Sequence, residues 1–148
     1  WGSGEPITIT LADRRANRPA GAVSGIVFED ISGSSEGAIN LVSVGIAAIS
    51  DVTLSRVHIA QRPGSFGNGQ SYDLRPTAAD LAPPTGLAGR ANAWVRDQDG
   101  AIVGLVPYPG GLPGLFAPGI DGLVLSDVTF ERPSPLPPGW NPAEIVTR

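Results

Sequence analysis

One pattern of residue types occurs three times in this chain, in segments that start at Ser24, Ser50 and Asp121. Each copy begins with two small or polar residues and continues with an aliphatic residue, any residue, and Phe or Leu. Two polar residues follow, and then apolar residues at alternate positions. A short unit that recurs in this way cannot bury its apolar face alone, so its copies must stack on one another. The repeats therefore predict an all-β fold of the solenoid type.

The alternation of apolar residues slips by one position inside every copy. Ile26 and Phe28 point to one face, and strict alternation would place residue 30 there as well, yet the next apolar residue is Ile31. The same slip occurs at Ser55-Arg56 and at Ser126-Asp127. It predicts a tight bend near Glu29-Asp30 and at the two matching sites. Three stacked core rows should result: Ile26, Val52 and Leu123; Phe28, Leu54 and Leu125; Ile31, Val57 and Val128.

Two further segments alternate in the manner of strands, residues 6–11 and residues 37–42. Three short strands per circuit of the chain predict a right-handed parallel β-helix. We expect one domain over residues 1–148, with coils at about 1–61 and 119–132 and a long loop insertion at about 62–118. Residues 133–148 should form a C-terminal cap, in which a proline-rich segment ends the ladder and lays Trp140 over the last coil.

Composition excludes several classes of partner. The chain of 148 residues has 20 Gly and 15 Pro, which favours strands and turns over helices. Its net charge is −4, it has no Lys and no basic run, so neither nucleic acid nor an anionic membrane is an expected partner. There is no Cys, and the single His58 should be a surface residue, so we expect no metal site and no cofactor. The chain has no Met and begins at Trp1, so we expect upstream coils of the same parent protein, in one polypeptide or as a separate chain.

The insertion holds the favoured binding element, Tyr72, Asp73 and Arg75. An Arg side chain can bind the carboxylate of a uronate through two parallel hydrogen bonds. A carboxylate such as Asp73 accepts hydrogen bonds from sugar hydroxyls, and a Tyr ring offers a flat face to a pyranose. The alternative is an Asp–Arg pair that only pins the loop to the helix.

Three other residues are candidates for substrate contact. Glu36 lies on a turn bounded by glycines and either lines a cleft or is a plain turn residue. Trp94 and Tyr108 lie on the insertion, where their rings either stack on sugars or anchor the insertion on the solenoid. Residues 97–100 separate two apolar runs, 91–96 and 101–106, and predict a hairpin. Asp30 and Asp127 are expected to be solvated residues of the bends.

Several segments, in their order along the chain, resemble a known family. These are residues 1–7 (WGSGEPI), residues 70–76 (QSYDLRP), and residues 112–117 (LPGLFA) followed by residues 121–123 (DGL). Together with the repeat they resemble the C-terminal coils of glycoside hydrolase family 28, the polygalacturonase-like β-helices, in their bacterial branch. The resemblance implies a secreted or periplasmic enzyme that hydrolyses a pectin-like or other acidic glycan with inversion. Such an enzyme needs two carboxyl groups about 6.5–9.5 Å apart.

The catalytic signatures of that family do not occur in this chain. Its Asn-Thr-Asp, Asp-Asp, His-Gly and Arg-Ile-Lys motifs are all absent, so the catalytic residues are unknown. We expect this chain to contribute substrate-subsite walls and the helix cap, while upstream coils hold the catalytic acids.

Two other functions fit the same architecture. A polysaccharide lyase uses a strong base beside a uronate and releases products that absorb ultraviolet light. A non-catalytic carbohydrate-binding or tailspike-like β-helix would form a trimer and carry long runs of similar coils. The single long insertion favours a shaped binding surface over such a shaft.

Overall fold

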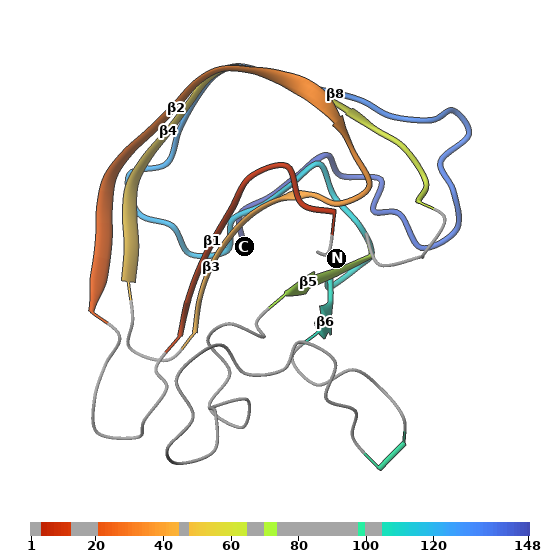
Figure 1. Ribbon diagram of the computed structural model, residues 1–148, viewed down its shortest axis with the longest axis horizontal. Helices are drawn as coiled ribbons and strands as arrows, with labels where there is room; N and C mark the ends of the chain where they lie inside the picture. The colour runs from red at the N-terminus through yellow and green to blue at the C-terminus, as the bar shows by residue number, and fades with distance from the viewer. Residues whose placement is uncertain (1–3, 13–20, 45–47, 65–69, 74–97, 100–104) are drawn as a thin grey trace, which may run out of the picture.

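The computed structural model of the chain describes residues 4–12, 21–44, 48–64, 70–73, 98–99 and 105–148, which contain nine β-strands and no α-helix (Figure 1). The fold is therefore all-β, as the repeats predict. The strands are β1 (Thr8–Ala12), β2 (Ala22–Ser35), β3 (Ile39–Val44), β4 (Ala48–Gln61), β5 (Ser71–Asp73), β6 (Leu105–Pro107), β7 (Leu115–Phe116), β8 (Val124–Glu131) and β9 (Ile145–Val146).

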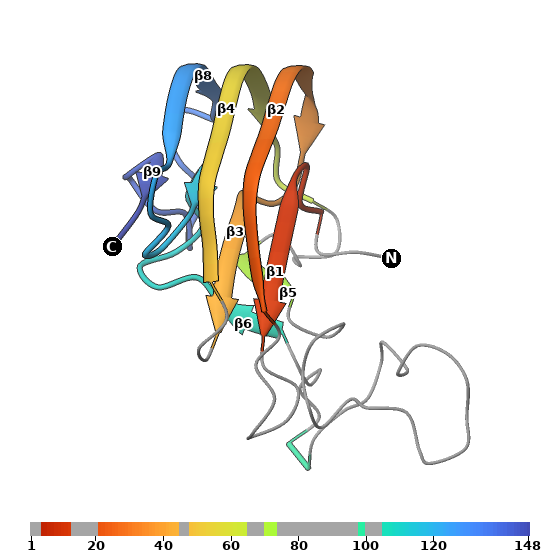
Figure 2. The same cartoon turned by 90° about the vertical axis from the view of Figure 1, so that its left-hand side faces the viewer.

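Two parallel sheets make up most of the described structure. One has the strand order β1-β3-β7-β9 and the other the order β2-β4-β8. Apart from the antiparallel pair β5-β6, successive strands along the chain alternate between these sheets, so each circuit adds one strand to both. In Figure 1 the three long strands follow one arched course around β1 and β3, and Figure 2 shows β2, β4 and β8 lying side by side.

The register of the three-stranded sheet confirms the predicted rows. Phe28 pairs with Leu54 and Leu54 with Leu125. Ile31, Val57 and Val128 form the next row in the same way, and Ile26 pairs with Val52. Leu123 completes that row, because Thr53 and Val124, the residues that follow Val52 and Leu123, are themselves paired.

The predicted bend is present in all three long strands. Asp30, Arg56 and Asp127 have φ values of 56°, 53° and 54°, which lie in the left-handed region that residues other than glycine rarely enter. One such residue lets the chain turn a corner while pairing continues on both sides of it. A second bend lies five residues earlier, at Gly25, Asp51 and Gly122, where φ is 71°, 51° and 66°. The sequence carries the same signal for this bend, because Val23 and Ile26, Ile49 and Val52, and Ile120 and Leu123 all face the core three positions apart. The predicted repeat begins after the first residue of each pair, so it does not include this slip.

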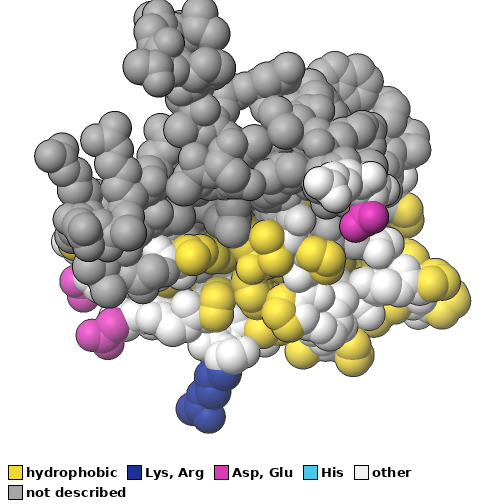
Figure 3. Space-filling model, turned by 90° about the horizontal axis from the view of Figure 1, so that it is seen from below, with side chains coloured by type: hydrophobic (Ala, Val, Ile, Leu, Met, Phe, Trp, Pro, Cys, Tyr) yellow, Lys and Arg dark blue, Asp and Glu magenta, His cyan; other side chains and the backbone are white. Residues whose placement is uncertain are grey.

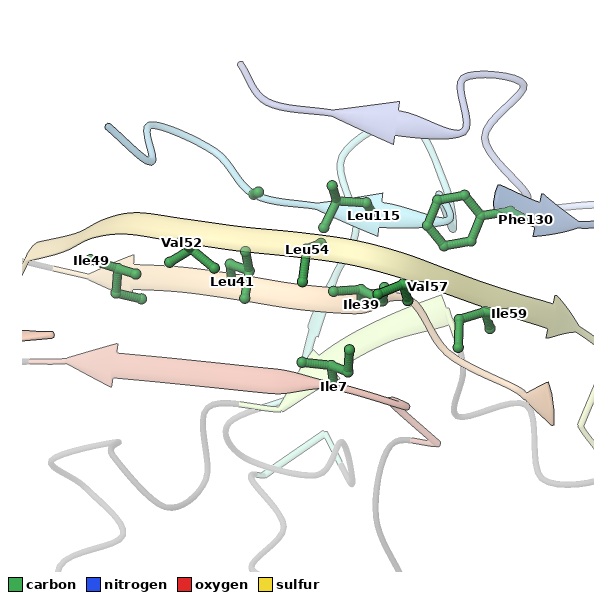
Figure 4. Close-up of a cluster of buried hydrophobic side chains, with 11 residues drawn as sticks. Ile7, Ile39, Leu41, Ile49, Val52, Leu54, Val57, Ile59, Leu115 and Phe130 are labelled. Carbon is green, nitrogen blue, oxygen red and sulfur yellow. The ribbon is translucent and has the colours of Figure 1, made fainter. Parts of the chain in front are cut away.

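The hydrophobic core lies between the two parallel sheets (Figure 4). The middle strand β4 contributes its side chains most completely: Val52, Leu54 and Val57 are fully buried. Their partners on β2 and β8 are only half-buried against the same core. Burial therefore falls from the middle of the stack toward both of its ends.

Polar side chains at the carboxyl ends of β2 and β4 form hydrogen bonds with the backbone of the turns nearby. Ser35 Oγ donates to the Gly37 carbonyl at 3.0 Å. Gln61 is buried, and its Nε2 donates to the carbonyls of Gly37 at 3.1 Å and Pro113 at 2.8 Å. Gln61 thus connects two circuits of the chain that the insertion separates in sequence.

Two boundaries differ from those that the sequence predicts. Leu115 and Phe116 form β7 and pair with Ile39 and Asn40, so the stack resumes inside the range 62–118 that was predicted as an insertion. At the C-terminal end Trp140 is buried, as expected of a cap. The proline-rich segment does not end the ladder, however, because β9 follows it and pairs with β7. Prolines interrupt pairing only where they stand, and the chain rejoins the sheet beyond them.

The hairpin predicted around residues 97–100 falls largely on residues outside the described part of the chain. Gln98 and Asp99 do lie in a turn. Residues 91–96 are not described, and the described end of the second arm pairs elsewhere, with Val106 opposite Tyr72 and Leu105 opposite Asp73. In Figure 1, β5 and β6 lie below the N-terminus, to the right of the lower parts of β1 and β3.

Candidate functional site

The candidate site lies on the outer face of the four-stranded sheet. Ile39 and Leu41 of β3 belong to the core between the sheets, so the residues that alternate with them, such as Ala38 and Val42, point outward. They pack in a second hydrophobic cluster, which also contains Tyr108, Leu112, Phe116 and Trp140. This sheet is therefore covered on both faces.

Three aromatic rings meet on this outer face. The centroids of Tyr72 and Tyr108 are 5.4 Å apart, those of Tyr72 and Phe116 5.4 Å, and those of Tyr108 and Phe116 5.2 Å with the rings edge to face. Such tilted geometries are the favourable ones for aromatic pairs. Tyr108 is only 4% exposed, whereas Tyr72 is half-buried. Tyr108 therefore acts as an anchor, and Tyr72 is the ring that keeps an accessible surface.

Two carboxylates stand close to these rings. The backbone N–H of Asp73 donates to Glu5 Oε1 at 3.2 Å, which ties the residue before β1 to the end of β5. Glu5 also lies close enough to Tyr108 for its charge to act on the phenol. Glu5 and Asp73 each make a further interaction as well. Sugar hydroxyls commonly donate to carboxylates arranged in this way.

Burial keeps both tyrosines neutral. It raises the pKa of Tyr108 far above the ordinary value, and the negative charges of Glu5 and, less strongly, of Tyr72 add to the rise. The Ala38 backbone opposes this slightly, although it makes no hydrogen bond of normal geometry to the hydroxyl. Burial alone raises the pKa of Tyr72. Both hydroxyls are therefore hydrogen-bond donors at any physiological pH.

Asn40 is an unusual member of this face. It is fully buried on β3, and within the described part of the chain neither its amide nitrogen nor its amide oxygen has a hydrogen-bond partner. Its neighbours in the row are Thr8 on β1 and Phe116 on β7, and of these only Thr8 has a side chain that can form a hydrogen bond with an amide. Buried polar groups are paired in most proteins, so this amide lowers the stability of the sheet.

Glu36 lies near the same edge of the sheet, on the turn between β2 and β3. It is half-buried, with its Cβ against Gly4 and its carboxylate over Gly64. The Gly37 N–H donates to the Gly4 carbonyl at 3.0 Å, so Glu36 and Glu5 stand on neighbouring turns of the chain. The structure thus brings Tyr72, Asp73, Tyr108 and Glu36 to one side of the molecule.

Two of the predicted residues, Arg75 and Trp94, lie outside the described residues. Three residues of the site were not singled out from the sequence: Glu5, Asn40 and Phe116. A signal existed for Glu5, because it shortly precedes a strand of the four-stranded sheet just as Glu36 does. For Asn40 and Phe116 no signal existed, because which face of β3 the insertion covers depends on tertiary packing.

Figure 3 shows the underside of the molecule, toward which β5 and β6 lie in Figure 1. Hydrophobic side chains gather in its centre with few charged ones among them, next to residues that are not described. In the described ranges, no group of three or more His, Asp or Glu side chains could hold a metal ion.

The outer face of the three-stranded sheet is polar and exposed. His58 points outward, as predicted, with Nδ1 2.7 Å from Thr129 Oγ1 and Nε2 3.6 Å from Asp127 Oδ2. Arg56 binds Asp30 through Nε at 2.6 Å and Glu29 through Nη2 at 2.8 Å. Asp30 and Asp127 are exposed at their bends, in agreement with the expectation of solvated corner residues.

Comparisons of the chain with protein families, with curated proteins and with solved structures find no match. Among the described residues no helix is long and apolar enough to span a membrane. The resemblance to glycoside hydrolase family 28 thus rests on the sequence segments alone.

Proposed function

We propose that this chain is a section of a right-handed parallel β-helix and belongs to a secreted or periplasmic enzyme that hydrolyses a pectin-like or other acidic glycan. Two observations support the architecture: the strands alternate between two parallel sheets, and the three repeats stack in register. Parallel strands joined by crossovers are right-handed in nearly all proteins. The substrate class and the localisation come from the resemblance to glycoside hydrolase family 28.

The observation that carries the function is the half-exposed ring of Tyr72. Tyr108 and Phe116 pack against this ring, and Glu5 Oε1 accepts a hydrogen bond from the backbone N–H of the next residue, Asp73. A sugar ring has an apolar face of C–H groups and a rim of hydroxyls, so an aromatic face beside carboxylates matches it on both counts. The proposed role of this face is one wall of a substrate subsite.

The hydrolytic step itself needs a carboxylic acid that protonates the leaving oxygen and a carboxylate that activates water. We assign neither role to a residue of this chain, since the catalytic signatures of the family are absent from it. In this proposal the acid and the base stand on upstream coils, and Tyr72, Asp73 and Glu36 hold the sugar units beside the cleaved bond.

Binding of an oligogalacturonate by the chain tests the proposal, measured by isothermal titration calorimetry. We expect Tyr72→Ala to weaken binding about tenfold, or about 1.4 kcal/mol, because the apolar area that the ring covers on a bound sugar is lost. The matched control is His58→Ala, which removes an exposed ring from the other sheet and should leave affinity unchanged. Circular dichroism confirms that both variants fold.

Equal binding by the wild type and Tyr72→Ala would contradict the assignment of the subsite, and absence of binding by the wild type would contradict the glycan-binding role. The assembled protein should release reducing sugars without absorbance near the ultraviolet band of an unsaturated uronate. Products that do absorb there would show that the enzyme is a lyase.

A further inference from the structure

The bends of the three long strands are of two kinds that alternate along the stack. β2 has glycine at the first bend and aspartate at the second, Gly25 and Asp30, and the same order holds for Gly122, two residues before β8, and Asp127 on β8. β4, which lies between them, has Asp51 at the first bend and Arg56 at the second. All six residues share the left-handed conformation, so the alternation concerns side chains and not backbone.

The first bend shows why glycine and aspartate alternate. A Cβ atom added to Gly122 would lie 2.5 Å from Asp51 Oδ1 and 3.2 Å from the Asp51 backbone nitrogen, so no side chain fits. Gly25 occupies the same position on β2, yet an added Cβ would meet none of the described atoms within 4 Å. Since Asp30, Asp51, Arg56 and Asp127 show that non-glycine residues adopt this conformation here, conformation alone does not require a glycine at Gly25. The close neighbour that would require one is missing on the open side of β2.

Charges alternate at the second bend. Arg56 is bound by Glu29 and Asp30 of β2 on one side, and Asp127 of β8 follows it on the other. The sequence of charges along the stack is therefore acidic, basic, acidic. The open side of Glu29 and Asp30 presents two carboxylates that share a single guanidinium, so a second cation would complete the pattern there.

Burial points to the same edge. The inward side chains of β2, such as Ile26, Phe28 and Ile31, are half-buried, whereas their partners on β4 are fully buried. Residues 53–60 of β4 lie opposite both β2 and β8, whereas β2 has β4 as its one neighbour among the described strands of that sheet. The other edge of this 14-residue strand has no partner among the described strands, and such an edge is a template for another strand.

We propose that the open edge of β2 binds a parallel β-strand of the β4 kind, with an aspartate at the bend facing Gly25 and an Arg or Lys at the bend facing Asp30. The proposal rests on the β-helix architecture proposed above and specifies which kind of strand the next coil would contribute at this edge. It does not depend on the sugar site, so failure of glycan binding leaves it standing.

A second copy of the chain is not the expected occupant. Its free long strand, β8, has glycine and aspartate at the bends, as β2 has, so two carboxylates would meet at the second bend. In the other sheet β9 extends the stack beyond β7, where β1 of another copy would need to lie. The two ends of the stack are thus unsuited to each other.

A capped peptide with the sequence of residues 48–61, which is that of β4, tests the proposal when titrated against the full chain by fluorescence anisotropy. The control is the same peptide with Arg56→Glu. We expect the first to bind at least tenfold more tightly at low salt, and the difference to shrink in 1 M salt, where charges more than about 3 Å apart are screened. The Asp30→Asn variant of the chain should lose most of the difference, because Asn keeps the left-handed bend but not the charge.

Hydrogen exchange of the complex should show protection of the β2 amides and no change at β8. Equal affinity of the two peptides, no binding by a chain that is folded by circular dichroism, or protection at β8 would each overturn the proposal. Sedimentation velocity of the chain alone should give a monomer. A self-association that Asp30→Asn alters would assign the edge to a second copy instead.

Discussion

The two ends of the stacked sheets are finished in different ways. At the C-terminal end a proline-rich segment leaves β8, buries Trp140 against Leu112, and returns to the four-stranded sheet as β9. At the other end β1 and β2 lie at the edges of their sheets, and no described residue covers them. Part of the core is exposed at both ends. Only the C-terminal end is bordered by a segment, the proline-rich one, that cannot pair with a long strand.

This difference shows two ways in which a stack of repeats can end. A closed end needs residues that break the repeat, and here prolines and a single Trp do so after the last copy. At an open end the repeat continues up to the last strand. The residue pattern of the repeat then indicates which kind of strand can pair with that edge. Stability is therefore expected to be greatest in the middle of the stack and to depend on the cap at only one end.

The sharpest test of the burial gradient uses two leucines in one row. Leu54→Ala on β4 should lower the free energy of unfolding by about 4 kcal/mol, since the side chain is fully buried and leaves a cavity. Leu125→Ala on β8 removes the same atoms from a half-buried site, so we expect about half that loss. Urea unfolding followed by circular dichroism gives both values. Equal losses would show that the edge strand is as well covered as the middle one.

The closed end is tested by Trp140→Ala. Trp140 is 8% exposed, packs on Leu112, and has the Arg132 guanidinium 5.3 Å from its ring centroid. We expect a loss of about 3 kcal/mol in the same measurement. Leu136→Ala is the control: it removes an apolar side chain from the same segment, but from an exposed position, and should cost less than about 1 kcal/mol. A similar cost for both would mean that Trp140 does not hold the cap.

The sequence predicted the repeating part of the fold well because period and conformation are linked there. The slip between Phe28 and Ile31 has one simple explanation, a bend, and Asp30 has the left-handed φ value of such a bend. The first bend shows the same slip, from Val23 to Ile26 across Gly25, but that slip lies at the border of the predicted repeat, which begins only at Ser24. The return of the chain as β9 was missed because a pair of residues in a ladder leaves no periodic signal.

The candidate site was less predictable, since it depends on how the insertion covers the sheet. Tyr72 and Tyr108 could be named as aromatic residues of a long loop, but not assigned to exposed and buried roles. The structure assigns them by packing Tyr108 on the outward residues of β3. The link from Glu5 to Asp73 joins residues far apart in sequence, and no local pattern encodes it.

The packing of the insertion on the closed part of the stack is tested by Tyr108→Phe. At pH 7 we expect a change of less than about 1 kcal/mol, because no described residue forms a hydrogen bond with the hydroxyl. Because the pKa of Tyr108 is raised in the folded state, its neutral form contributes stability that is present in full below the unfolded value of about 10 and is lost as the pH rises beyond it. The urea midpoint should therefore fall less between pH 7 and pH 11 in Tyr108→Phe than in the wild type. An equal fall would contradict the burial of this phenol.

The smallest effect concerns the charges at the open end. The hydrogen bond from Arg56, with its charge, holds the pKa of Asp30 below the ordinary value, although slight burial opposes this. A lowered folded pKa contributes stability above the unfolded value of about 3.9, and this is lost as the pH falls through the folded one.

In an NMR titration, Arg56→Gln should raise the pKa of Asp30 toward 3.9, and Arg62→Gln, which breaks the ion pair with Glu131 near the closed end, should not. If the open edge accepts a strand with a basic residue at its bend, adding that strand should lower the pKa of Asp30 further, because a second cation then faces the same carboxylate. An unchanged titration in Arg56→Gln would mean that solvent screens this exposed pair, and the charge pattern at the open end would then give a partner strand little specificity.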